Sequence, residues 1–188
     1  MKEFEMRFKA DNKNKIKEDI ESLDFKKRAS FQMSDLIFES REWVPGQGLK
    51  PGYFIVRLRL TTHEKPKLEL KQMIDADTWE EISLFADHPR NLVKMLSIIL
   101  RPVRVISKNR EEYENGSLII SFDDVKHLGK FIEIEGPRNE VNKIIKKLRF
   151  DTSEKQPVYG STLFYLEREG KIKFKLKDMD NELKRFNL

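Results

Sequence analysis

The sequence contains no cysteine and only three histidines, and these shortages remove several classes of chemistry. Without cysteine there can be no disulfide, no thiolate zinc site and no cysteine nucleophile. His63, His88 and His127 stand far apart, without HExxH or a comparable ligand spacing, so we interpret them as loop or cap residues. The chain also lacks the GxxxxGK[ST] phosphate loop and the GxSxG nucleophile elbow. Any catalysis must therefore depend mainly on carboxylates, lysines and arginines.

Long apolar runs are absent as well. No stretch approaches the ~18 apolar residues of a membrane-spanning helix, and the charged N-terminus does not resemble a signal peptide. We therefore expect a cytoplasmic protein without a membrane partner. A length of 188 residues fits one domain, 1–188, in which residues 151–188 form a helical or irregular C-terminal appendage.

Charge is what the sequence has in abundance. Charged residues make up 37% of the chain, with 37 Lys and Arg against 32 Asp and Glu, for a net charge of +5. The sequence pI near 9.2 favours an anionic partner.

Apolar periodicity and turn residues predict an α+β protein. We expect helices at 11–23 with Asp11 as N-cap, at 77–86, at 88–100 capped by Asp87 with Pro89 in its first turn, and at 137–148. The remaining clear segments predict strands at 2–9, 29–40, 53–62, 66–73, 102–114, 117–125 and 130–136, with a hairpin turn at Asn115 and Gly116. The segment 43–53 reads as a loop, and 159–171 and 180–186 as short helices packed on the outside.

Six of these strands alternate apolar residues with charged ones, which gives each strand one charged face. The first strand has Glu3, Glu5 and Arg7 on that face. The charged faces of the others carry Arg57 and Arg59; Lys67, Glu69 and Lys71; Arg104, Lys108 and Arg110; Asp123; and Glu133 and Glu135.

The charged faces allow two interpretations. In an open sheet they would simply face water. In a closed barrel they would converge on one interior that holds about six cations and five carboxylates, which is costly unless ions of both signs are bound. The segregation of glutamates to the first and last strands, and of cations to the middle strands, favours the barrel.

The same residues resemble the motifs of a known family. Glu3, Glu5 and Arg7 are similar to the ExExK signature that opens CYTH domains, the triphosphate tunnel metalloenzymes. VRLRL resembles the family's RxR strand, KLELK its LTxK strand, and SKNREEY its KxR strand. ISFDDVKHLGKFIEIEG resembles its LDxxxxLGxFxEIE segment. The resemblance covers residues 1 to about 136.

The resemblance implies a closed eight-stranded antiparallel β-barrel, or triphosphate tunnel, with helices packed outside. It implies that cations bind the triphosphate of a small molecule, namely Arg7, Arg57, Arg59, Lys71, Lys108 and Arg110. It also implies that carboxylates bind Mg²⁺ or Mn²⁺, namely Glu3, Glu5, Asp123, Glu133 and Glu135, with Asp123 as a further ligand or a water-orienting group. Of these residues we expect Glu133, Glu135 and Lys71 to be catalytic. Phosphoryl transfer needs mainly positioning and charge neutralisation, so no separate nucleophilic side chain is missing.

Two positions depart from the family pattern. Arg7 stands where the motif has lysine, which keeps the charge but replaces the compact ammonium by a bidentate guanidinium. Glu69 stands where the motif usually has threonine, and adds a carboxylate that would tune substrate choice or pair with a neighbouring lysine. We interpret Lys67 and Arg104 as members of surface salt bridges.

The reaction stays open between three alternatives. We favour a metal-dependent triphosphatase that hydrolyses the terminal phosphate of inorganic triphosphate or a nucleoside triphosphate. The second alternative is a class IV-type adenylate cyclase, although no nucleobase pocket is evident. The third is a non-catalytic polyphosphate-binding or RNA-binding module, against which the five carboxylates argue. A homodimer is compatible with the sequence, which does not fix the oligomeric state.

Overall fold

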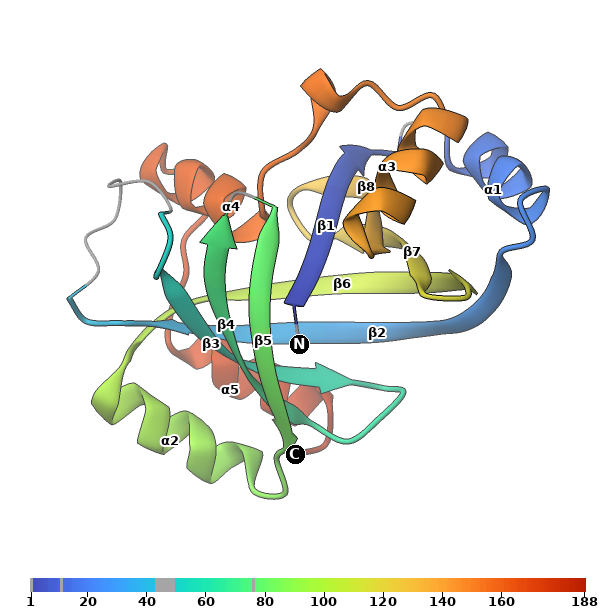
Figure 1. Cartoon of the computed structure of the whole chain (residues 1–188). Helices are drawn as coiled ribbons and strands as arrows, with labels where there is room; N and C mark the ends of the chain where they lie inside the picture. Colours follow the sequence, from blue (N-terminus) through green and yellow to red (C-terminus); the bar gives the residue numbers. More distant parts are fainter. Residues whose placement is uncertain (1, 11, 43–49, 76) are drawn as a thin grey trace.

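The polypeptide forms a closed antiparallel barrel of eight strands (Figure 1). The computed structural model describes residues 2–10, 12–42, 50–75 and 77–188, with the backbone alone for residues 2 and 3. The strand order around the barrel is β1-β5-β4-β3-β2-β6-β7-β8, and β8 pairs with β1 to close it. The strands are β1 (Lys2–Lys9), β2 (Lys26–Glu39), β3 (Phe54–Thr61), β4 (Lys67–Asp75), β5 (Thr78–Phe85), β6 (Arg101–Asn115), β7 (Leu118–Val125) and β8 (Gly129–Gly136). The predicted fold class is therefore confirmed.

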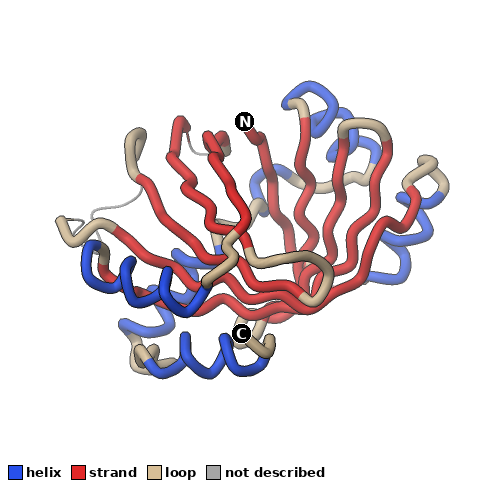
Figure 2. The backbone as a smooth tube through the Cα atoms, turned by 90° about the horizontal axis from the view of Figure 1, so that it is seen from below, coloured by secondary structure: helices blue, strands red, loops and turns tan. Residues whose placement is uncertain are grey.

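Most of the helices pack on the outside of the barrel (Figure 2), whereas the helix that begins at Tyr159 lines its interior. The helices are α1 (Lys13–Glu21), α2 (Pro89–Ile99), α3 (Arg138–Lys147), α4 (Tyr159–Arg168) and α5 (Lys177–Arg185), with a short 3₁₀ turn at Thr152–Glu154. The two C-terminal helices are present as predicted, but α4 does not pack only on the outside, because its Tyr159 and Phe164 line the interior of the barrel. None of the described helices has the length and hydrophobicity that crossing a membrane requires.

Two parts of the hydrophobic core lie between the outer face of the barrel and these helices, and a third packs Ile37 and Ile106 against Tyr159 and Leu163 of α4. Helices α1 and α3 cover β1, β7 and β8, where Ile20 and Ile145 pack with Phe122. Helices α2 and α5 cover β2 and β3, where Leu183 packs with Leu58. Strands with period-two alternation must point their other face inward, so the charged residues of all these strands project into the barrel.

One predicted helix is wrong. Residues 77–86 contain helix-forming Glu, Leu and Ala, yet 78–85 form strand β5, which pairs with β4 along its length and with β1 at Lys2–Phe4. Pairing in the sheet overrides the local helix propensity. The overlooked signal was the alternation of Trp79, Glu81 and Ser83 with Glu80 and Ile82.

Two helix boundaries also differ from prediction. The N-cap of α2 is His88 and not Asp87, although Pro89 occupies the first turn as expected. The N-cap of α1 is Asn12, whose side chain accepts a hydrogen bond from the Lys15 backbone. The expected cap Asp11 and most of the predicted loop at 43–53 lie outside the described residues. The hairpin at Asn115 and Gly116 is confirmed.

Candidate functional site

A cavity of about 600 Å³ occupies the interior of the barrel. Its lining includes nearly all of the side chains that the sequence singled out: Glu5, Arg7, Arg57, Arg59, Lys71, Lys108, Arg110, Glu133 and Glu135. Two predicted residues are not among them. Glu3 lies in β1, but its side chain is outside the described part of the chain, and Asp123 is buried in the wall.

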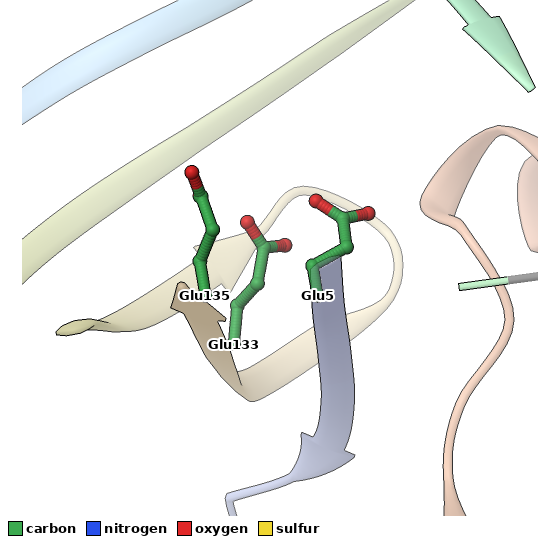
Figure 3. A group of neighbouring side chains, drawn as sticks. All are labelled: Glu5, Glu133 and Glu135. Atoms are coloured by element: carbon green, nitrogen blue, oxygen red, sulfur yellow. The ribbon is translucent and has the colours of Figure 1, made fainter. Parts of the chain in front are cut away.

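Three carboxylates converge on one side of the cavity (Figure 3). Glu5 projects from β1, and Glu133 and Glu135 project from β8, the strand that pairs with β1. One oxygen of each lies within 4.8 Å of the others. Hard divalent cations prefer oxygen ligands, and Mg²⁺ typically takes one or two carboxylates together with substrate oxygens and water. The donor set therefore fits a divalent cation.

Arg7 links this carboxylate group to the cationic wall. Its Nη2 donates to Glu133 at 2.6 Å and to Glu5 at 3.2 Å, and its guanidinium lies 4.2 Å above the ring of Tyr159. Burial raises the pKa of Glu133, but the positive charges of Arg7 and Arg110 outweigh it and hold that pKa well below its usual value. Glu133 is therefore ionised at neutral pH, and its oxygens are bonded to Arg7 and Arg110.

Asp123 serves as a buried counter-charge for two cations. It accepts hydrogen bonds from Lys108 Nζ at 2.7 Å, from Nε and Nη2 of Arg110 at 2.7 Å each, and from the Tyr159 hydroxyl at 2.9 Å. Its side chain is 0% exposed. Burial, together with the negative charges of Asp123 and Glu133, raises the pKa of Tyr159, so the phenol remains a hydrogen-bond donor.

The opposite wall holds two arginines between two further carboxylates. Arg57 faces Glu69 across the β3–β4 pair, and Arg59 faces Asp35 across the β2–β3 pair. Arg59 donates to Asp35 at 2.9 and 3.3 Å and to Glu69 at 3.3 Å, while Arg57 Nε bonds Glu69. Burial raises the pKa of Asp35, but the positive charges of Arg59 and Arg57 lower it by more. The net effect is a pKa below the usual value.

Lys71 completes the cationic lining from β4. Its ammonium lies 3.2 Å from Glu81 and 4.0 Å from Glu5, so it stands between the carboxylate group and the β5 strand. Glu81 also contacts Arg57 at 3.2 Å. Burial raises the pKa of Glu81, yet Arg57 and Lys71 lower it below its usual value.

Several residues that line the cavity were not predicted from the sequence, among them Asp35, Glu39, Glu81 and Tyr159. Asp35 and Glu39 interrupt the apolar run of β2 at a spacing of four, which was a readable signal of an inward-facing pair. Glu81 was missed because β5 was taken as a helix. Tyr159 carried no readable signal, because it begins α4 in the tail and reaches the site only through the tertiary fold.

The two residues interpreted as surface salt bridges behave differently. Lys67 forms the expected bridge, with Glu64 at 2.7 Å near the rim of the cavity. Arg104 lines the cavity as well, but it donates to the carbonyl oxygen of Gly160 in α4, so it joins β6 to that helix.

The barrel with its inward-facing charges matches a known family in sequence. The chain belongs to the CYTH domain family, whose family model matches residues 1–158. A search of curated protein sequences found no match. Tyr159, which contacts Arg7 and Asp123, is the first residue after the matched region.

Solved structures with the same fold span most of the chain. The PH1012 protein of Pyrococcus horikoshii OT3 has a TM-score of 0.73 at 19% identity, covering 86% of this chain and 98% of its own. The PH1819 protein of the same organism has a TM-score of 0.68 at 22% identity, covering 89% of this chain and 99% of its own. A Hippeastrum protein described as having a dominant triphosphatase activity has a TM-score of 0.57 at 16% identity, covering 94% and 98%. At these identities the likeness establishes the fold.

Proposed function

We propose that this chain is a divalent-metal-dependent triphosphatase that hydrolyses the terminal phosphate of inorganic triphosphate or a nucleoside triphosphate. The observation that carries the proposal is the juxtaposition, inside one closed barrel, of cations on several strands with the Glu5, Glu133 and Glu135 group. A chain of phosphates has oxygen acceptors along its whole length, which guanidinium and ammonium groups recognise by charge-assisted hydrogen bonds. The triphosphatase activity described for the Hippeastrum protein of the same fold supports the choice of reaction.

In this mechanism the cations hold the phosphate chain. Lys108 and Arg110 are fixed by Asp123, and Arg7 is fixed by Glu133, so their donors are oriented before the substrate enters. Preorganised charge of this kind stabilises the negative charge that develops on the leaving diphosphate. Arg57, Arg59 and Lys71 would contact the rest of the chain from the opposite wall.

Glu5, Glu133 and Glu135 would hold Mg²⁺ or Mn²⁺, with Glu3 on the same strand as a further candidate. Such a cation neutralises phosphate charge and lowers the pKa of a nearby water. In the net reaction, water oxygen bonds to the terminal phosphorus as the bridging P–O bond breaks, and the products are phosphate and diphosphate, or a nucleoside diphosphate. We assign Asp123 to the positioning of Lys108 and Arg110, because four hydrogen bonds occupy its oxygens.

The test is phosphate release from inorganic triphosphate, ATP and pyrophosphate, each with Mg²⁺, Mn²⁺ or EDTA, with cyclic AMP assayed in parallel. We expect metal-dependent release from the triphosphates without cyclic AMP. Glu135→Gln should abolish this turnover and weaken Mn²⁺ binding measured by calorimetry, whereas Glu80→Gln, on the exposed outer face of β5, should change neither. Cyclic AMP with pyrophosphate from ATP would make the protein a cyclase, and full activity of Glu135→Gln would overturn the metal assignment.

A further inference from the structure

The β2–β5 side of the tunnel cancels the positive charge of its cations within the wall. Three carboxylates lie there against three cations: Asp35, Glu69 and Glu81 against Arg57, Arg59 and Lys71. The formal charges of this group therefore sum to zero, and Glu69 supplies one of the three negative charges.

The carboxylate of Glu69 is placed in the wall and not in the lumen. Glu69 is 2% exposed and is absent from the described lining of the cavity, whereas Arg57 and Arg59 are part of it. Its two oxygens bond to different arginines, Oε2 to Arg57 and Oε1 to Arg59 at 3.3 Å. A ligand in the lumen would therefore contact the guanidinium groups directly, and the negative charge of Glu69 behind them would weaken their electrostatic attraction for it.

Hydrogen bonding remains open to a ligand on this wall although the charge is cancelled. A guanidinium has five N–H donors in a planar fork, and the bonds to Asp35, Glu69 and Glu81 use three of those of Arg59 and two of those of Arg57. Arg57 and Arg59 can thus still recognise phosphate oxygens by geometry. What the wall cannot supply is a net attraction that grows with the charge of the ligand.

We propose that Glu69, together with Asp35, is a specificity-determining element that restricts the tunnel to short phosphate chains by cancelling the positive charge of Arg57 and Arg59. The inference rests on the proposed function and narrows its substrate class. A long polyphosphate would place more charged groups against this wall than a triphosphate does, so the neutralisation would cost it more binding free energy. Glu69 stands where the related motif has an uncharged threonine, so this counter-charge is a property of the present chain.

The test compares affinities for two probes, inorganic triphosphate and a polyphosphate of about ten or more phosphates, by calorimetry in EDTA so that no turnover interferes. Glu69→Gln keeps the shape and removes one buried negative charge a few ångströms from the lumen, so we expect binding of triphosphate to tighten by about tenfold and that of polyphosphate by more. The salt dependence of binding should steepen as well, because a net charge has been added to the wall. Asp35→Asn removes a negative charge from the same group on a different strand, so it should also tighten binding of both probes. It keeps the proposal testable if Glu69→Gln fails to fold.

The matched control is Glu80→Gln, which makes the same change in net charge on the outer face of β5. Unchanged or weaker binding of both probes by Glu69→Gln and Asp35→Asn would overturn the inference, because the two carboxylates would then only hold the arginines in place. Equal tightening in Glu80→Gln would also overturn it, since the effect would follow from overall charge. Phosphate release by the wild-type protein with Mg²⁺ or Mn²⁺, measured on the same preparation, tests the proposed function separately.

Discussion

The buried group around Asp123 gives the sharpest test of how this tunnel is held together. The side chain of Asp123 is 0% exposed and receives four hydrogen bonds, from Lys108, from two nitrogens of Arg110 and from Tyr159. Asp123→Asn keeps the shape but removes the charge and turns one acceptor into a donor. At least one cation would then face an amide N–H in place of a carboxylate oxygen.

The expected cost follows from the burial of the partners. Lys108 and Arg110 are 6% and 7% exposed, so neither can recover full hydration when its counter-ion is lost. Removing one partner of a buried ion pair typically costs about 3–5 kcal/mol. For a protein of this size each kcal/mol corresponds to a change in melting temperature of about 2–4 °C, so we expect a decrease of roughly 10 °C.

Thermal unfolding followed by circular dichroism checks the prediction, with Asp124→Asn as control. Asp124 is the next residue in β7 but is exposed, so its variant should melt within about 2 °C of the wild type, as surface changes usually do. A decrease of less than about 2 °C for Asp123→Asn would refute the reasoning. Calorimetry with Mn²⁺ separates the roles: unchanged metal affinity agrees with a positioning role, and a large loss would make Asp123 a ligand.

Three further predictions address separate parts of the molecule. The folded-state pKa of Glu111 is about 2, because hydrogen bonds from Lys13 and Lys17 outweigh the effect of burial. Its stabilising contribution is therefore present above the ordinary pKa of 4.5 and is lost as the pH falls toward 2. Glu111→Gln should lower the free energy of unfolding at pH 7 by only about 1 kcal/mol, because the group is partly exposed and screened by solvent. The effect should be smaller at pH 2, where Glu111 is half protonated even in the folded state. An equal effect at both pH values in denaturant titrations would contradict this. Tyr159→Phe keeps the ring beside Arg7 and removes one hydrogen bond to a buried carboxylate, so it should cost about 1–3 kcal/mol in the same titrations, and no change would show that the hydroxyl contributes nothing. Leu58→Ala should cost about 2–5 kcal/mol yet leave triphosphate affinity unchanged, because this side chain packs outside the barrel; a parallel loss of affinity by calorimetry would place it in the site.

Strands and the direction of their side chains could be predicted from the sequence wherever apolar and charged residues alternate without interruption. The alternation of Val56, Leu58 and Leu60 with Arg57 and Arg59 specifies both the strand and the direction of each side chain, so the inward-facing cations could be read directly. The prediction failed where the local sequence was compatible with both a helix and a strand. The segment WEEISLFA suits a helix by composition, and only its pairing with β4 and β1 makes it a strand, which is a non-local property.

Pairing between charged groups could not be predicted for the same reason. The list of inward-facing residues follows from strand periodicity, but partners follow from register, which places Glu69 opposite Arg57 and Asp35 opposite Arg59. From the sequence, Glu69 is an extra carboxylate that would tune substrate choice or pair with a neighbouring lysine. In the structure its partners are the two arginines.

The ion pairs inside the barrel also explain how the protein can fold before any ligand arrives. A lumen with only cations would be unstable, because buried like charges repel and lack hydration. Here Asp123 lies against Lys108 and Arg110, and Glu133 against Arg7, so the cations that would bind phosphate already have partners. An entering phosphate chain would compete with Glu133 for Arg7, whereas Asp123 would stay in the wall behind Lys108 and Arg110. A divalent cation that occupied Glu5 and Glu133 would release Arg7 for the phosphate. Metal and triphosphate should therefore each bind more tightly when the other is present. The metal would displace Arg7 from Glu5 and Glu133, and the phosphate would hold Arg7 away from those carboxylates.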